Sequence, residues 1–182
     1  DALKSIHTEE ALDALLESSV QSDARVRLRV QSAIGGFYNP RALESAMKTI
    51  RSESNPTIIN TAMRSLSGYG NSGIDSILLQ YLREPSYRNT HAESAIAAME
   101  KQDNPVFIMP ILETLMERKG LFSTRGMVNA LSSLAYLGRH QDDKSMLLSF
   151  IAGRLQDPKS AVRSGAIRAL ATLRDPKAIA IL

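Results

Sequence analysis

The sequence predicts an all-α fold, a solenoid built from antiparallel helix pairs. Apolar residues recur at helical spacing along the chain. The same apolar pattern returns at a nearly constant interval, which is typical of repeat proteins. Few β-branched runs alternate with period two, and no Asn-Gly or Asp-Gly turn, which would predict a β-hairpin, occurs.

The repeat is clearest from Asp157 to Leu173, where apolar and small residues share one helix face. Its central residue, Ala166, has counterparts at Val30, Ala62, Ala95 and Ala130, with successive separations of 32, 33, 35 and 36 residues. Small residues at these places let neighbouring helices approach closely. The first-helix anchors are Val26, Val30, Ala33, Ile34 and Phe37; Ile58, Ala62, Ser65, Leu66 and Tyr69; Ala95, Ala98, Met99 and Gln102; Ala130, Ser133, Leu134 and Leu137; and Val162, Ala166, Ala169, Leu170 and Leu173.

A helix-start signal follows each first helix. Asn39-Pro40, Asn104-Pro105 and Asp175-Pro176 combine a capping side chain with a proline that has no N–H to leave unpaired. Asn71-Ser72 and His140-Gln141 take this place in the other two units. Each unit therefore has a first helix, a short turn and a second helix. The predicted second-helix stripes are Ala42, Leu43, Ala46, Met47 and Ile50; Ile74, Ile77, Leu78 and Leu82; Ile111, Leu112, Leu115 and Met116; and Met146, Leu147, Phe150, Ile151 and Leu155.

Other prolines mark the turns between units. Asn55-Pro56, Glu84-Pro85 and Asp157-Pro158 are expected to open first helices. Pro110 falls inside the second helix of the third unit, where an interior proline would break a backbone hydrogen bond. That helix is therefore expected either to be kinked or to start late, near Met109.

We expect one repeat domain covering residues 1–182. Its units are 1–21 (partial), 22–54, 55–85, 86–120, 121–157 and 158–182 (truncated). The chain begins at Asp1 without a methionine and stops at Leu182 within an apolar run. These ends predict that it is a fragment of a longer polypeptide.

Composition narrows the function classes. Hydrophobic residues make up 43% and charged residues 23% of the 182 residues, which predicts a buried core and argues against disorder. The absence of cysteine excludes disulfides, thiolate nucleophiles and cysteine-based zinc sites. No apolar run reaches the length of a membrane span, so no membrane partner is expected.

Two patterns resemble sites but have simpler interpretations. Gly68 to Gly73 matches Gly-x-Gly-x-x-Gly, but it follows a predicted helix, whereas a dinucleotide-binding loop follows a strand. We interpret it as a turn between helices. The histidines His7, His91 and His140 lack the spacing of converging metal ligands, and we interpret them as surface or turn residues. No metal or cofactor is therefore expected in this fragment.

Basic residues gather near the C-terminal end and around Arg25, Arg27 and Arg29. A net charge of +3 and the acidic residues interspersed among them favour a solvated face, and argue against nucleic-acid binding. We expect Arg27 and Arg163 to bond turn carbonyls or aspartates.

Exposed positions of the second helices are expected to line the concave side of the solenoid and to face a protein or peptide partner. The predicted partner-facing residues are Arg41, Lys48, Arg51, Arg83, Glu113 and Glu117. Their charges are mixed, so they indicate no single class of ligand.

The string from Asp157 to Leu170, with Val162-Arg163 and Ala169-Leu170, resembles the HEAT and HEAT-like repeat families, and Val26-Arg27 matches it in part. A narrower resemblance is to the C-terminal helical region of bacterial zinc aminopeptidases of the M1 type. The segments that carry it are Asp23 to Arg27, Glu84 to Asn89, Asn129 to Leu131, Leu134 to Gly138 and Arg168 to Leu170.

The second resemblance implies that this fragment is the non-catalytic accessory domain of a larger metallo-aminopeptidase. It would pack on the catalytic domain, which is another domain of the same chain, and help enclose peptide substrate. Zinc and the His-Glu-x-x-His motif would lie in the parent chain, since that motif is absent here. The alternatives are a free-standing HEAT-repeat scaffold for protein binding and a DNA-binding HEAT-like protein.

Overall fold

The structure, a computed structural model, describes residues 8–70, 72–118 and 120–182. These residues form α-helices and short 3-10 helices, and no strand occurs among them. The α-helices are α2 (Glu9–Glu17), α3 (Ala24–Ile34), α4 (Pro40–Ser52), α5 (Pro56–Ser65), α6 (Ser72–Arg83), α7 (Thr90–Gln102), α8 (Ile108–Glu117), α9 (Thr124–Gly138), α10 (Ser145–Ala152) and α11 (Ser160–Leu173). The 3-10 helices are η1 (Leu66–Gly68), η2 (Tyr87–Asn89), η3 (Pro105–Phe107), η4 (Gly153–Gln156) and η5 (Pro176–Ala180).

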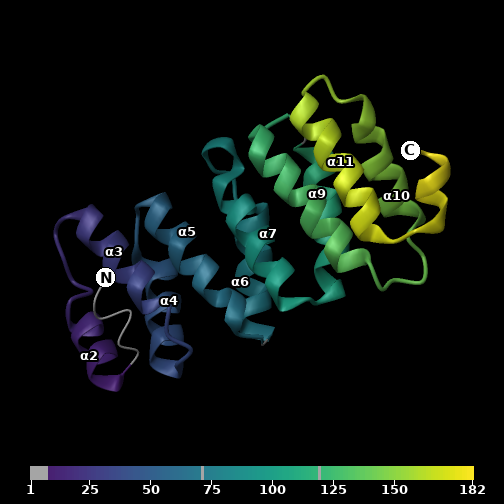
Figure 1. Cartoon of the computed structure of the whole chain (residues 1–182). Coiled ribbons are helices and arrows are strands. Elements are labelled where there is room, and N and C mark those ends of the chain that lie inside the picture. The colour runs from purple at the N-terminus through teal and green to yellow at the C-terminus, as the bar shows by residue number, and fades with distance from the viewer. Residues whose placement is uncertain (1–7, 71, 119) are drawn as a thin grey trace.

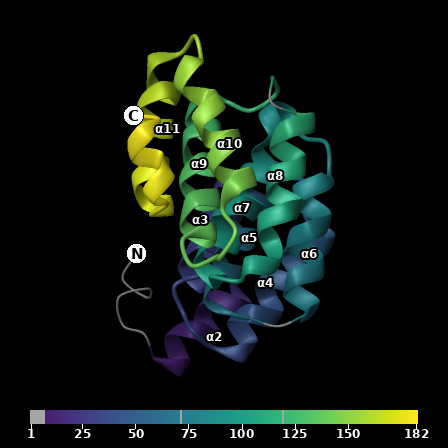
Figure 2. The ribbon, with the colours of Figure 1, turned by 90° about the vertical axis from the view of Figure 1, so that its right-hand side faces the viewer.

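The helices stack side by side in two layers (Figure 1). The first-helix layer consists of α3, α5, α7, α9 and α11, and each of these packs on the next. The second-helix layer holds α2, α4, α6, α8 and α10. The end view in Figure 2 shows α4, α6 and α8 on one side and α3, α9 and α11 on the other. The predicted all-α solenoid of HEAT-like helix pairs is confirmed.

The predicted caps form in most of the described units. The side-chain oxygens of Asn39, Asn55, Asn104 and Asp175 accept hydrogen bonds from the backbone N–H two residues on, at 2.9 to 3.1 Å. Asn71 lies outside the described residues. Each cap satisfies an N–H that the helix itself leaves unpaired, and so fixes where the helix begins.

The helix start predicted at His140-Gln141 is wrong. The α10 helix begins at Ser145, where the Asp143 carboxylate accepts from the backbone N–H at 2.9 Å. Arg139 lies over the Tyr136 ring and pairs with Asp103, which fixes the turn before α10 instead.

Pro110 lies in the first turn of α8, which starts late, at Ile108, after the short helix η3. The proline therefore costs no hydrogen bond of the helix interior, since the N–H groups of a first turn have no partner within the helix. The prediction of a late start, made as one of two alternatives, is confirmed.

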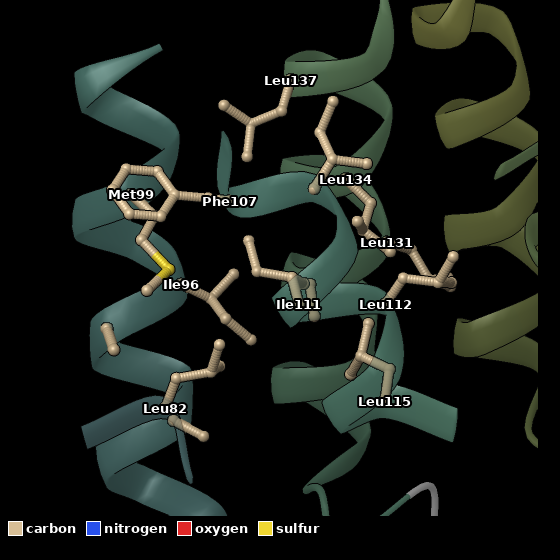
Figure 3. Close-up of a cluster of buried hydrophobic side chains, with 14 of the residues drawn as sticks. Leu82, Ile96, Met99, Phe107, Ile111, Leu112, Leu115, Leu131, Leu134 and Leu137 are labelled. Carbon is tan, nitrogen blue, oxygen red and sulfur yellow. The ribbon is translucent and has the colours of Figure 1, made fainter. Parts of the chain in front are cut away.

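The core lies between the two layers. Figure 3 shows Ile96 of α7, Phe107 and Ile111 from the η3–α8 segment, and Leu134 of α9 converging there, and each is at most 2% exposed. The four central alanines of the predicted first helices are also at most 1% exposed: Ala62, Ala95, Ala130 and Ala166. Glycines tighten the same layer, since a Cβ on Gly165 of α11 would meet Val128 of α9 at 3.1 Å.

Three predicted core anchors are exposed. Val26 is 41% exposed, whereas its counterparts in later units, Ile58 and Val162, are 1% and 2% exposed. Met116 and Met146 are 59% and 55% exposed because they lie on the side of the second-helix layer that no other described helix covers.

Polar side chains join successive units at the turns within pairs. The Tyr69 hydroxyl accepts from the backbone N–H of Asn39 at 3.0 Å and lies 3.1 Å from the carbonyl oxygen of Phe37. Lys144 donates from Nζ to the carbonyl oxygens of Arg139 and Leu173, at 2.7 and 2.9 Å. Such bonds give each turn a fixed place relative to the next.

Candidate interaction surfaces

All six predicted partner-facing residues are exposed on the second-helix layer. Their positions are the start of α4 (Arg41), its middle and end (Lys48 and Arg51), the end of α6 (Arg83) and one face of α8 (Glu113 and Glu117). Exposure is a requirement for contact with a partner. Their role in binding stays a prediction.

Arg41 already has partners within the chain. Its Nη2 lies 2.5 Å from Oδ1 of Asp13, and its Nη1 lies 3.8 Å from Oε2 of Glu9. Both carboxylates belong to α2. Arg41 and Lys48 line one shallow groove between α2 and α4. The structure therefore brings together two of the six residues there, while the others are spread along α4, α6 and α8.

The first-helix layer is the more tightly packed of the two. Each first helix contacts the next extensively, whereas successive second helices contact each other less. The first helices therefore make the continuous contact along the array. That second helices line a concave side stays a prediction.

A groove with a volume of about 530 Å³ runs between α3 and α5 on the outward side of the first-helix layer. Arg29 lines it from α3 and Arg64 lines it from α5. The remaining lining residues are mostly small or hydroxyl-bearing: Leu28, Ser32, Gly35, Thr57, Thr61 and Ser65. Among the described residues, no carboxylate lines this groove, which we call the α3–α5 groove.

A second groove on the same side lies between α7 and α9, and we call it the α7–α9 groove. It is lined by two carboxylates, Glu93 and Glu100, and by one lysine, Lys101. The Ser123 hydroxyl donates to Oε1 of Glu93 at 2.9 Å, and the Ser133 hydroxyl donates to Oε2 of Glu100 at 2.5 Å. These bonds hold both carboxylates between the helices, so the charge along the first-helix side changes sign from one groove to the next.

Sequence reasoning missed the α3–α5 groove, although the signal was present. Arg29 precedes the central anchor Val30 by one residue, and Arg64 follows the central anchor Ala62 by two. Both positions lie beside the packed face of an amphipathic helix, where two neighbouring helices leave a furrow. The predicted binding residues instead all lie on the second-helix layer.

The arginines predicted to bond turns do so. Arg27 donates from Nη1 to the carbonyl oxygens of Gln21 and Ser22, at 2.9 and 2.8 Å, and its Nε lies 2.8 Å from Oε2 of Glu53. This ion pair lowers the pKa of Glu53 to about 2, chiefly through the Arg27 hydrogen bonds. Arg163 donates to the carbonyl oxygens of Asp157 and Pro158 in the equivalent turn.

The remaining candidate sites are the glycine-rich segment and the three histidines. The segment from Gly68 to Gly73 joins η1 to α6, so it follows a helix and not a strand. His140 is exposed, and His7 lies outside the described residues. His91 is only 6% exposed, so its interpretation as a surface or turn residue is wrong: it begins the buried face of α7, beside Tyr81. Among the described residues, no three His, Asp or Glu side chains converge as a metal site would require.

Within the described ranges, no helix combines the length and apolar character needed to cross a bilayer.

Comparison with known families gives one finding. The family model described as PBS lyase HEAT-like repeat matches residues 162–182, which cover most of α11 and all of η5. No curated protein matches the chain. HEAT-like repeats are generally non-catalytic and commonly mediate contacts between proteins. The matched segment and the stacked helix pairs together identify the chain as similar to the HEAT-like repeat family.

Proposed function

We propose that this chain is a non-catalytic interaction domain of a larger protein, and that the larger protein is an M1-type zinc aminopeptidase. In this role the array packs on the catalytic domain and helps enclose peptide substrate. The observation that carries the proposal is the pair of open grooves on one side of a tightly packed helix array. Such an array offers a long, rigid surface that a second domain or a peptide can follow.

The packing supports a rigid rather than an adaptable surface. Four neighbouring first helices contact through residues at most 1% exposed, and the turns are joined by hydrogen bonds between units. A preformed surface loses little conformational entropy on binding. The array is therefore suited to hold another domain in one orientation.

The residues that support the aminopeptidase parentage include the segment from Glu84 to Asn89. This segment opens the third unit, and it holds Arg88 and Asn89 in the left-handed region, with φ of 52° and 53°. Two successive non-glycine residues in that region are uncommon. A constrained turn of this kind gives a reason for keeping its sequence within a family of domains.

The gene sequence upstream of the codon for Asp1 tests the parentage. We expect it to encode His-Glu-x-x-His followed by a downstream Glu, the set that binds zinc and activates water in this class. A gene with no such motif upstream would exclude the aminopeptidase parent. The interaction role is then tested by isolating the array and asking whether it binds the rest of its own polypeptide.

A further inference from the structure

We propose that the α3–α5 groove binds an acidic segment of a partner polypeptide, with Arg29 and Arg64 pairing with its carboxylates. This proposal rests on the proposed interaction function and adds the site and the chemistry of the partner. It differs from the predicted binding residues, which all lie on the second-helix layer.

The two arginines approach the groove from opposite walls. Arg29 lies one residue before the central anchor Val30 of α3, and Arg64 lies two residues after the equivalent anchor Ala62 of α5, so each arginine lines the groove from a different helix. Near one end of the groove the helices come very close, since a Cβ on Gly35 would meet Oγ of Ser65 at 2.2 Å. An extended chain lying in the furrow would pass within reach of both guanidinium groups.

Neither guanidinium is neutralised within the described residues. Arg64 is within 3.5 Å of the Thr61 hydroxyl, and Arg29 has no hydrogen bond or ion pair there. On the same or an adjacent helix, Arg25 pairs with Asp23, Arg27 with Glu53 and Arg41 with Asp13. Arg25, Arg27 and Arg41 thus have carboxylate partners, whereas Arg29 and Arg64 line one groove without such a partner among the described residues. Arginine donates to carboxylates in bidentate geometry, which makes a carboxylate a suitable ligand.

Hydroxyl groups add further donors beside the arginines. The Thr61 and Ser65 hydroxyls donate to backbone carbonyls of their own helix, at 2.9 and 3.1 Å. The Ser32 and Thr57 hydroxyls line the groove and make no hydrogen bond within the described ranges. They are available to a carboxylate or to a peptide backbone carbonyl.

The charge along the first-helix side favours a peptide over a nucleic acid. A nucleic-acid strand carries uniform negative charge and would meet Glu93 and Glu100 as it continued to the α7–α9 groove. A peptide can change its charge along its length. Charge complementarity therefore indicates a partner segment that is acidic where it crosses α3 and α5.

The test uses the 182-residue chain and a fluorescein-labelled peptide of four Glu-Ser repeats, followed by fluorescence anisotropy at low salt. We expect Arg29→Gln and Arg64→Gln each to weaken binding by roughly 10- to 150-fold, the range of one charge-assisted hydrogen bond. Arg168→Gln is the matched control: Arg168 is exposed on α11, far along the array from the α3–α5 groove, and its replacement should leave the affinity unchanged. Arg64→Glu should further shift preference towards a Lys-Ser peptide. Circular dichroism checks that each surface variant is folded.

Equal affinities for wild type, Arg29→Gln and Arg64→Gln would overturn the proposal, as would tighter binding of a labelled 12-nucleotide single strand that the same variants abolish. If the glutamate peptide fails to bind while the array still binds the rest of its own polypeptide, only the groove assignment is lost. If the peptide binds as expected and that polypeptide does not, the groove assignment stands and the proposed parent fails.

Discussion

Gln102 donates from Nε2 to the carbonyl oxygen of Tyr69, 33 residues earlier, at 3.0 Å. Tyr69 in turn bonds the backbone of Asn39 in the unit before it. The two residues occupy the same place in successive units, at the end of the first helix. The polar side chain of Gln102 therefore occupies a position where the repeat would otherwise have an apolar residue, and there it bonds the backbone of the preceding unit.

Replacing Gln102 by Leu tests this bond. The substitution restores the apolar pattern but leaves the Tyr69 carbonyl without its partner, so we expect a loss of about 1 kcal/mol of unfolding free energy. Urea denaturation measures the change. Gln80→Leu, on the exposed side of α6, is the control and should change the free energy little. Equal stability of the Gln102→Leu variant and wild type would show that the bond has no net value.

Gly138 shows where the core leaves no room. A Cβ on this residue would lie 2.2 Å from Cδ1 of Leu147 and 3.2 Å from Cδ1 of Leu173, both buried. We expect Gly138→Ala to cost about 1–3 kcal/mol through overpacking, more than the helix propensity of alanine returns. Gly153→Ala is the control, since a Cβ there meets nothing within 4 Å. We expect the thermal unfolding midpoint of Gly138→Ala to fall, and that of Gly153→Ala to rise or stay unchanged. A Gly138→Ala variant as stable as wild type would contradict the packing described.

Glu53 predicts an acid-dependent contribution to stability. Its pKa is about 2 in the folded chain and near its ordinary value of 4.5 when unfolded, because Arg27 bonds its carboxylate. A depressed folded pKa stabilises the fold above the unfolded pKa, and that contribution is lost as pH falls from about 5 to 2. After allowance for solvent screening at a pair whose Arg27 side chain is 26% exposed, we expect roughly 1–2 kcal/mol at pH 7.

Glu53→Gln should therefore be less stable than wild type at pH 7, and the difference should shrink towards pH 2. Urea midpoints measured at several pH values show this directly. Glu44→Gln, an exposed substitution on α4, the helix that Glu53 follows, is the control and should keep the wild-type pH profile. A constant difference between Glu53→Gln and wild type across the whole range would contradict a role for the charge.

The fold could be predicted in detail because the repeat carries redundant signals. Central alanines, proline caps and apolar stripes each point to helix pairs, and the caps at Asn39, Asn55 and Asn104 form as the sequence indicates. The predictions of burial were wrong where burial depends on residues that are distant in the sequence. Val26 has the apolar spacing of a core residue and is nevertheless 41% exposed. His91 looked like a turn residue because its neighbours in space, Tyr81 and Glu84, belong to the preceding helix and the turn after it.

The candidate site was less predictable than the fold. The pattern identifies exposed positions on both layers, but it does not say which layer packs more closely. Close approach depends on contacts such as that between Gly126 and Glu93, 33 residues apart, which no local pattern reveals. The α3–α5 groove likewise exists only once α3 and α5 are placed side by side.

Tyr81 provides a link between second helices that sequence patterns do not suggest. Its buried hydroxyl donates to the carbonyl oxygen of Ile50 at 2.9 Å, joining α6 to α4, and burial raises its pKa. We expect Tyr81→Phe to lose about 1 kcal/mol, because the Ile50 carbonyl then has no partner in the core. Tyr38→Phe removes a hydroxyl from a ring that is 80% exposed and should be neutral in the same denaturation series. Equal midpoints for the two variants would mean that the α4–α6 bond contributes nothing.

The central claim is that this helix array is an interaction domain of a larger polypeptide. Isothermal titration calorimetry of the array against the separately produced remainder of its own polypeptide tests the claim most directly. The account predicts a one-to-one complex with a negative heat-capacity change from buried apolar surface. The absence of heat and of a complex, with both parts folded, would contradict it.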